Sequence, residues 1–287
     1  MSAHLVSHSY GKSRVRLTKV TRGPQQHDLK EMAVDITLEG AFDASYTCGD
    51  NSSVVATDSM KNTVYVLARE HPVDSIESFG LHLAEHFLRT YDHVTAATVS
   101  IDLTRWDRIH VDGKPHAYAF VGGGDERRTA EVRVTREGRS VTSGLTDLLV
   151  LKTTDSGFVG FVRDRYTTLR ETDDRIFATS VTANWTCRPD VKVCDWNGQF
   201  ERVRQLILET FATHKSLAVQ QTIHEIGDRV LAAVPEVDEI AITMPNKHRI
   251  LVDLSPFGLD NNNEIFVPID EPYGLIRGVL CRENAST

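Results

Sequence analysis

Cysteine is scarce in this chain of 287 residues and forms no CxxC pair. The four cysteines are Cys48, Cys187, Cys194 and Cys281. Cys187 and Cys194 are close enough in sequence to close a small loop or bind a metal, but no histidine lies beside them. In a chain without a secretion signal, we expect all four to be thiols.

Long apolar runs are also absent. No segment approaches the roughly 18 apolar residues of a membrane-spanning helix, and the N-terminal MSAHLVSHSYGKSRVRL lacks the apolar centre of a secretion signal. The C-terminal CRENAST is not the Ser-Lys-Leu peroxisomal address. Positive charge is not concentrated, because the net charge is -8 with both signs interspersed. We therefore expect a cytoplasmic protein that binds neither membrane nor nucleic acid.

Helical periodicity is present in three long segments, where apolar residues recur every three or four positions. We predict helices over residues 74–91, 198–215 and 216–237, and a shorter one over 58–70. At the start of the first, Asp74 and Glu77 resemble a capping box in which Asp replaces the usual Ser or Thr.

Eight further segments are strand candidates, several of them with alternating polar and apolar residues. They are 13–22, 28–42, 94–109, 127–138, 145–154, 175–187, 238–254 and 263–270. Each half of the chain then reads strand, strand, helix, helix, strand, strand. We predict an α+β fold of two repeats, residues 1–137 and 138–287, each with helices on one face of an antiparallel sheet.

The most conspicuous generic motif is HLAEH, His82 to His86, which matches the HxxEH pattern of inverted zinc peptidases. Phe79, Leu83 and Phe87 define the apolar stripe of this helix, so both histidines fall on its flanks. Without a third ligand the motif is better explained as part of a structural helix.

A glycine cluster, VGGGDERR at residues 121–128, is the second generic motif. A phosphate-binding loop would need a helix after it, whereas an alternating strand follows, so we predict a mobile hairpin turn. No GxSxG, Walker A or dinucleotide-binding fingerprint occurs. An enzyme with this sequence is expected to work without a bound cofactor.

Five less conspicuous segments are more informative about function when they are taken together. They are YGKSRVRLTKV, SSVVATDSMKNTVY, SGFVGFVRDRYTTLRETDDRIFAT, LAVQQT and PNKHRILVDLSPFG. Together they resemble the urate oxidase family, over nearly the whole chain from Tyr10 to about Leu275. The resemblance implies the tunnelling fold, with two tandem ββααββ units per chain, and a homotetramer whose four chains form a barrel-walled tunnel. One departure is the extended CRPDVKVCDWNG.

The resemblance also implies roles for individual residues. Catalysis would fall to Lys12, Thr57 and His248. Phe158 would stack on the purine, Arg175 would bind one edge, and Gln220 with the Val219 backbone would bind the other. Asn246 would face the dioxygen site, and Asp58 and Leu169 would add backbone contacts. Each site would be shared, with Lys12, Thr57 and Asp58 from one chain and Phe158, Arg175, Gln220 and Asn246 from another.

These residue types suit the oxidation of a flat purine anion. An arginine fork pairs with two rim acceptors, and a glutamine amide offers both a donor and an acceptor. A threonine hydroxyl needs a partner to accept a proton from urate, which a neighbouring lysine supplies, and histidine relays protons near neutral pH. The implied reaction converts urate, dioxygen and water into 5-hydroxyisourate and hydrogen peroxide through a 5-hydroperoxide. Dioxygen is a co-substrate, and no cofactor is expected.

Three alternatives stay open at this level. The first is another enzyme of the same fold, such as a pterin-pathway cyclohydrolase or aldolase, although those typically anchor the ring with glutamate where this chain has Gln220. The second is a purine-binding tetramer without catalysis, against which intact Lys12, Thr57 and His248 argue. A zinc hydrolase built on His82 and His86 is the most distant.

Overall fold

Four strands follow one another in sequence order in each half of the chain. The computed structural model describes residues 3–188 and 194–283, and the chain forms two compact units, Met1–Gly144 and Leu145–Thr287. The strand order is β1-β2-β3-β4 in the first half and β5-β6-β7-β8 in the second. The pairs β1–β2, β2–β3, β3–β4, β6–β7 and β7–β8 are all antiparallel. The predicted α+β class is confirmed, whereas the division between residues 137 and 138 stays a prediction.

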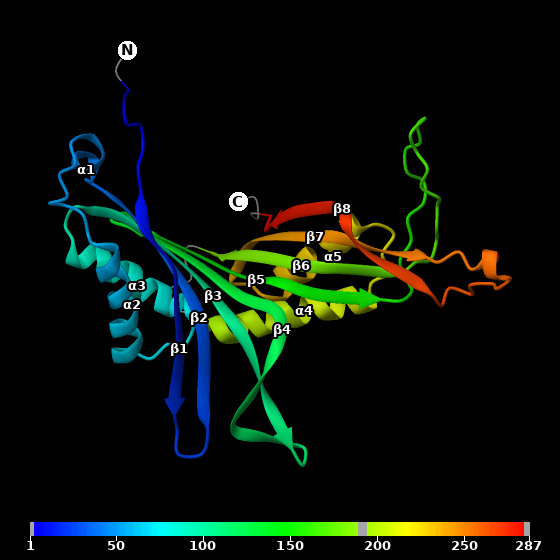
Figure 1. The fold of residues 1–287 in the computed structure, drawn as a ribbon, viewed down its shortest axis with the longest axis horizontal. Coiled ribbons are helices and arrows are strands. Elements are labelled where there is room, and N and C mark those ends of the chain that lie inside the picture. Colours follow the sequence, from blue (N-terminus) through cyan, green and yellow to red (C-terminus); the bar gives the residue numbers. More distant parts are fainter. Residues whose placement is uncertain (1–2, 189–193, 284–287) are drawn as a thin grey trace. The chain divides into compact units, whose positions relative to one another are not determined.

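The first half packs its helices on one face of its strands (Figure 1). Helix α3 contacts β3 and β4, and α2 contacts β1. Phe79, Leu83 and Phe87 of α3 are each at most 1% exposed, as their helical spacing predicts. The elements are β1 (Tyr10–Arg22), β2 (His27–Gly40), α1 (Asp43–Thr47), α2 (Thr57–Glu70), α3 (Ile76–Thr90), β3 (Val94–Val111) and β4 (Lys114–Thr135).

The second half repeats this arrangement. Helix α5 contacts β7 and β8 and packs beside α4. Its buried core is built around Trp185, Phe177 and Ile207. The elements are β5 (Arg139–Lys152), β6 (Phe177–Cys187), α4 (Trp196–Thr213), α5 (Val219–Ala233), β7 (Val237–Leu251), the 3-10 turn η1 (Ser255–Phe257) and β8 (Phe266–Cys281).

The predicted capping box of α3 is wrong in its members. The N-cap is Ser75, whose side chain accepts a hydrogen bond from the Ser78 backbone N–H at 3.1 Å, and the Ser78 hydroxyl faces back to the Ser75 N–H. Glu77 instead points inward and is fully buried, with Arg128 Nη2 at 2.7 Å and the Ser143 hydroxyl at 2.8 Å. The Glu77 side chain, which the sequence pattern assigned to capping, thus forms an ion pair with Arg128 of β4.

The predicted hairpin turn at residues 121–128 is also wrong, because this stretch lies inside β4. The chain reverses at Asp112–Gly113, where φ is +52° and +74°, as in the tight turn that an Asp-Gly pair favours. A Cβ added at Gly123 would lie 2.5 Å from Arg105 Cγ. The glycine therefore leaves space for the Arg105 side chain, whose Nη1 lies 2.9 Å from the Glu126 carboxylate.

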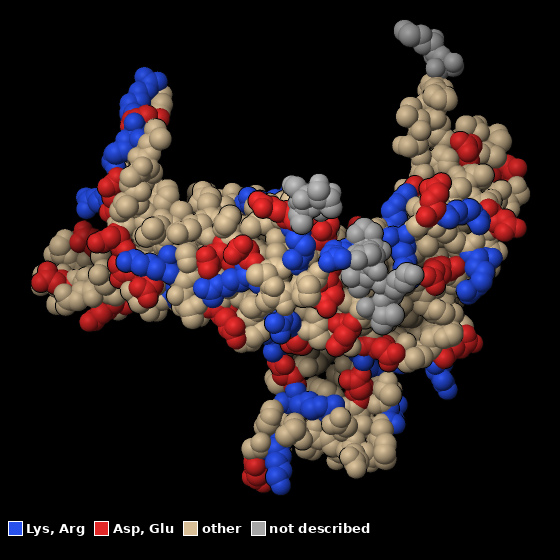
Figure 2. Space-filling view, turned by 180° about the vertical axis from the view of Figure 1, so that it is seen from behind, with Lys and Arg blue, Asp and Glu red and all other residues tan. Residues whose placement is uncertain are grey.

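Charged side chains of both signs are interspersed over the face drawn in Figure 2, without a broad area of one sign. Among the described residues, no helix combines the length and the apolar character needed to cross a membrane.

Candidate active site

In the first unit, the start of β1 is attached to the segment that leads into α2. The Tyr10 hydroxyl accepts a hydrogen bond from the Val55 N–H at 2.7 Å and donates one to the Val55 carbonyl at 3.2 Å. Burial raises the pKa of Tyr10, so the phenol keeps the proton that it donates. These two bonds hold Lys12, two residues along β1, near the N-terminus of α2.

A bulge directly after Lys12 fixes its place on the strand. The register between β1 and β2 shifts between Lys12 and Val15, and Arg14 has φ of +57°. The Arg14 N–H donates to Asp35 Oδ1 at 2.6 Å, and its guanidinium lies 3.0 Å from Asp102. Such bulges bend a strand and redirect its side chains.

Helix α2 begins at Thr57, and its N-cap is Ala56, which makes no side-chain capping bond. Thr57 is half-buried, whereas Asp58 is exposed. The Asp58 carboxylate binds Lys61 at 2.5 Å and Asn62 at 2.9 Å. The Lys61 hydrogen bond and charge lower the pKa of Asp58, and the nearby charge of Lys12 adds to this effect. Lys12, Thr57 and Asp58 therefore lie close together in the first unit.

In the second unit, the segment between β5 and β6 brings Phe158 and Arg175 together. It projects from the strands as a long loop (Figure 1). Phe158 and Thr172 exchange two backbone hydrogen bonds of 2.7 and 3.2 Å, and the Arg175 N–H donates to the Ser156 carbonyl at 2.7 Å. The Arg175 guanidinium carbon lies 5.6 Å from the centroid of the Phe158 ring.

The same segment is tied to the start of α5 through Ser216. The Gly157 N–H donates to the Ser216 carbonyl at 2.8 Å, and the Ser216 hydroxyl accepts from Thr222 of α5 at 2.8 Å. Helix α5 begins at Val219, which is buried, and Gln220 follows with its side chain exposed. The start of α5 and the Phe158–Arg175 pair are thus fixed through one serine.

Arg175 is a partly buried cation of this unit. Its Nε is buried and has no hydrogen-bond partner among the described residues. Burial lowers the pKa of its guanidinium, although arginine stays protonated in proteins. An arginine that is held partly buried against a ring face, with a donor unused, is suited to bind an anion.

On β7, Asn246 and His248 are two residues apart, and the register with β8 shifts between them. Asn246 pairs with Thr179 of β6 and Gly274 of β8, and His248 pairs with Ile269. Both are half-buried. The Nζ of Lys247, which lies between them in sequence, is 3.4 Å from the Asp270 carboxylate of β8. The lysine is thus paired with a carboxylate of the neighbouring strand.

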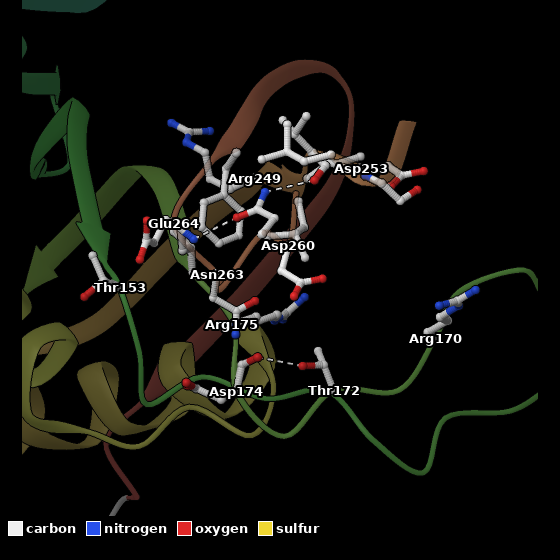
Figure 3. A pocket seen from close by; sticks show the side chains of 18 of the residues that line it. Thr153, Arg170, Thr172, Asp174, Arg175, Arg249, Asp253, Asp260, Asn263 and Glu264 are labelled. Atoms are coloured by element: carbon white, nitrogen blue, oxygen red, sulfur yellow. Dashed lines mark hydrogen bonds between the residues drawn. The ribbon is translucent and has the colours of Figure 1, made fainter. Parts of the chain in front are cut away.

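A cavity of about 940 Å³ lies beside Arg175, between residues 170–176 and 249–266. In Figure 3 the Arg175 side chain lies near those of Asp174, Asp260 and Asn263, while Arg170 stands apart on its loop. Of the residues implied by the family resemblance, only Arg175 lines this cavity. Leu169 is 55% exposed on the same loop.

The structure thus forms two groups from the expected site residues, one in each unit. The first is Lys12, Thr57 and Asp58. The second contains Phe158, Arg175, Val219 and Gln220, with Asn246 and His248 on β7 in the same unit. Sequence reasoning missed three supporting residues, Tyr10, Asp35 and Ser216, although Tyr10 lies within the YGKSRV motif itself.

His82 and His86 lie on the flanks of α3, as predicted. The rings of His82 and His71 are 4.0 Å apart between centroids. Burial lowers the pKa of both His82 and His86. Within residues 3–188 and 194–283, no group of three or more His, Cys, Asp or Glu side chains is placed to hold a metal ion.

Comparison with known proteins gives one consistent family. The family model described as Uricase matches residues 8–133 and 141–277, which covers most of both units. A uricase from Arthrobacter globiformis is 44% identical over 98% of this chain and 91% of its own length. A uricase from Dictyostelium discoideum is 41% identical over 99% of each chain.

Solved structures agree with the sequence comparison. The crystal structure of uricase from Arthrobacter globiformis superposes with a TM-score of 0.93, covering 100% of this chain and 98% of that one at 44% identity. Urate oxidase from Bacillus sp. TB-90 gives a TM-score of 0.81 at 26% identity, covering 96% and 100%. On these matches, which extend through both units, the chain belongs to the uricase family.

Proposed function

We propose that this protein is a urate oxidase that converts urate, dioxygen and water into 5-hydroxyisourate and hydrogen peroxide. The observation that carries the proposal is the Arg175–Phe158 pair, in a chain whose family match spans nearly its full length. A partly buried cation with an unused donor beside an aromatic face fits a flat anion with acceptors on its rim. Urate at neutral pH has this chemistry.

Substrate binding follows from this pair. Arg175 pairs with one edge of the ring, and the Phe158 ring covers its face, a contact that contributes roughly 0.5–1.5 kcal/mol beyond burial when aromatic rings stack. Gln220 and the Val219 backbone, at the start of α5, bind the opposite edge. The Ser216 hydrogen bonds hold these groups at a set spacing. Asp58 and Leu169 contribute backbone groups, which agrees with an Asp58 carboxylate already engaged by Lys61.

Oxidation needs a more electron-rich substrate, so a proton must first leave the urate monoanion. Thr57 accepts it with Lys12 as partner, because a hydroxyl alone is a weak base. The dianion then transfers electrons to dioxygen held near Asn246, and carbon 5 becomes a hydroperoxide. Water replaces the peroxide, and His248 relays protons to the leaving oxygen. Every step uses side chains with urate, dioxygen and water, so the reaction proceeds without a cofactor.

A complete site needs residues of both units. In our proposal Lys12, Thr57 and Asp58 come from one chain and the remaining residues from a neighbour within a homotetramer. Leu149 and Leu151 of β5 are 64% and 47% exposed, whereas Leu148 is buried. A strand that is apolar on both faces favours burial of the second face by another chain. The cytoplasmic location expected from the sequence stays a prediction.

The first experiment is urate consumption followed by near-ultraviolet absorbance, with an oxygen electrode and excess chelator. We expect urate and oxygen to fall in equal amounts while peroxide accumulates. If urate binds but is not consumed, the assigned binding residues stand and the proposed catalysis is refuted. Loss of activity on chelation, restored by one metal, would contradict the cofactor-free mechanism.

A further inference from the structure

Two of the four cysteines meet at a single side-chain nitrogen. Gln199 Nε2 lies 3.3 Å from Cys187 Sγ and 3.4 Å from Cys194 Sγ. The two sulfurs therefore cannot be farther apart than the sum of these two distances. Cys187 ends β6, and Cys194 lies just before Asp195, the N-cap of α4.

The position of the Gln199 nitrogen follows from its other neighbour. The Trp185 indole N–H, which can only donate, lies 3.0 Å from Gln199 Oε1. The amide oxygen must therefore face the indole, which leaves the NH2 group toward the sulfurs. Trp185 is 1% exposed and Gln199 7%, so the amide is fixed by packing. The result is one rigid donor shared by two thiols.

Both cysteines are half-buried, so a small oxidant can reach them. A disulfide requires the Cβ atoms to approach about 3.8 Å and the sulfurs about 2.05 Å. The two sulfurs already lie around one donor. Rotation of each side chain about its Cα–Cβ bond is the movement that would bring them together. Cys48 and Cys281 are exposed and lie on other elements, α1's C-terminal end and the end of β8.

We propose that Cys187 and Cys194 form a reversible dithiol–disulfide pair that hydrogen peroxide oxidises. One thiolate attacks peroxide, which breaks the O–O bond, forms a sulfenic acid and releases water after proton transfer. The second thiol attacks that sulfur, forms the S–S bond and releases a second water. Two thiols and one peroxide thus give one disulfide and two waters, with sulfur oxidised and peroxide reduced.

The proposed urate oxidation produces hydrogen peroxide, which is the oxidant needed here. This part of the inference rests on the proposed function. Each turnover would release one hydrogen peroxide, a two-electron oxidant, next to the protein that carries the pair. The dithiol chemistry itself does not depend on urate, because added peroxide can replace the turnover. The experiment separates the two.

The full-length protein is reduced, freed of reductant, treated with a small excess of hydrogen peroxide and then alkylated. Lys192 lies between the two cysteines, so trypsin converts the linked product into a two-chain peptide. We expect two thiols lost per chain, a mass lower by two hydrogen atoms before alkylation, and reversal by dithiothreitol. Peroxide that oxidises Cys48 or Cys281 first, or links Cys187 to Cys281, would overturn the proposal.

Matched variants test the pairing. In Cys187→Ser or Cys194→Ser, the linked product should vanish and the remaining cysteine should gain oxygen atoms. Cys48→Ser and Cys281→Ser should form the link as the parent does. In a parallel sample, urate replaces added peroxide. Peroxide release without the link would refute the turnover source, whereas no urate consumption would count against the proposed function alone.

Discussion

At the scale of single residues, Arg175 links structure and function. Its side chain is partly buried, lies against the Phe158 ring and leaves Nε without a partner among the described residues. Taking a charged donor out of water without a partner is costly, so such an arrangement points to a ligand. Arg170 lines the same cavity but is exposed on its loop.

We predict that Arg175→Lys lowers kcat/KM for urate strongly while Arg170→Lys changes it little. A lysine keeps the charge but loses the planar fork, so both rim contacts cannot form. Losing about 2 kcal/mol or more of such binding corresponds to a factor of roughly 30 in kcat/KM. Steady-state kinetics of both variants, with thermal unfolding as a folding control, measures the difference. Equal kcat/KM for the two variants would contradict the role of Arg175.

At the scale of elements, α3 shows how one helix carries both a buried and an exposed ion pair. Glu77 is fully buried with Arg128 Nη2 at 2.7 Å, whereas Glu85 is exposed with Arg139 at 3.7 Å. Removing one charge of a buried pair is far more costly than removing one of an exposed pair.

We therefore predict that Glu77→Gln destabilises the fold by about 3–5 kcal/mol. The control Glu85→Gln, on the same helix, should cost less than about 1 kcal/mol. Urea unfolding at one fixed protein concentration compares them, since assembly makes apparent stability depend on concentration. A similar loss of unfolding free energy in both variants would contradict the prediction that burial makes the Glu77–Arg128 pair the more costly one to break.

Element prediction succeeded where one physical pattern dominates. The stripe of Phe79, Leu83 and Phe87 defined α3, because a helix buries residues at that spacing. It failed at residues 121–128, where three glycines indicated a turn but lie inside β4. The Asp112–Gly113 turn was a stronger local signal, and Gly123 instead makes room for the Arg105 side chain.

At the scale of the whole molecule, the two groups of site residues lie in different units of the chain. Lys12 and Thr57 belong to the first, and Arg175 and Phe158 to the second. Sites shared between chains predict complementation between two inactive variants. A chain with Thr57→Ala still offers an intact Arg175 side, and a chain with Arg175→Ala still offers an intact Thr57.

Mixed tetramers of the two variants, refolded together, should regain activity, while each variant alone stays nearly inactive. For random assembly, about a quarter of the sites would combine both intact sides. Native mass spectrometry verifies that hybrids form, and urate consumption measures recovery. Verified hybrids with no more activity than the parent variants would refute shared sites.

The sequence by itself determined the fold class, the order of the strands and longer helices, and the family, because periodicity is local and the motifs around Lys12, Thr57, Arg175 and His248 are contiguous. It also placed Asn246 and His248 on one strand. Only the tertiary structure decided that Glu77 pairs inward, that Ser216 joins Gly157 to α5, and that Cys187 and Cys194 meet at Gln199. These contacts join elements far apart in sequence or depend on which way a side chain turns, and packing in three dimensions fixes both.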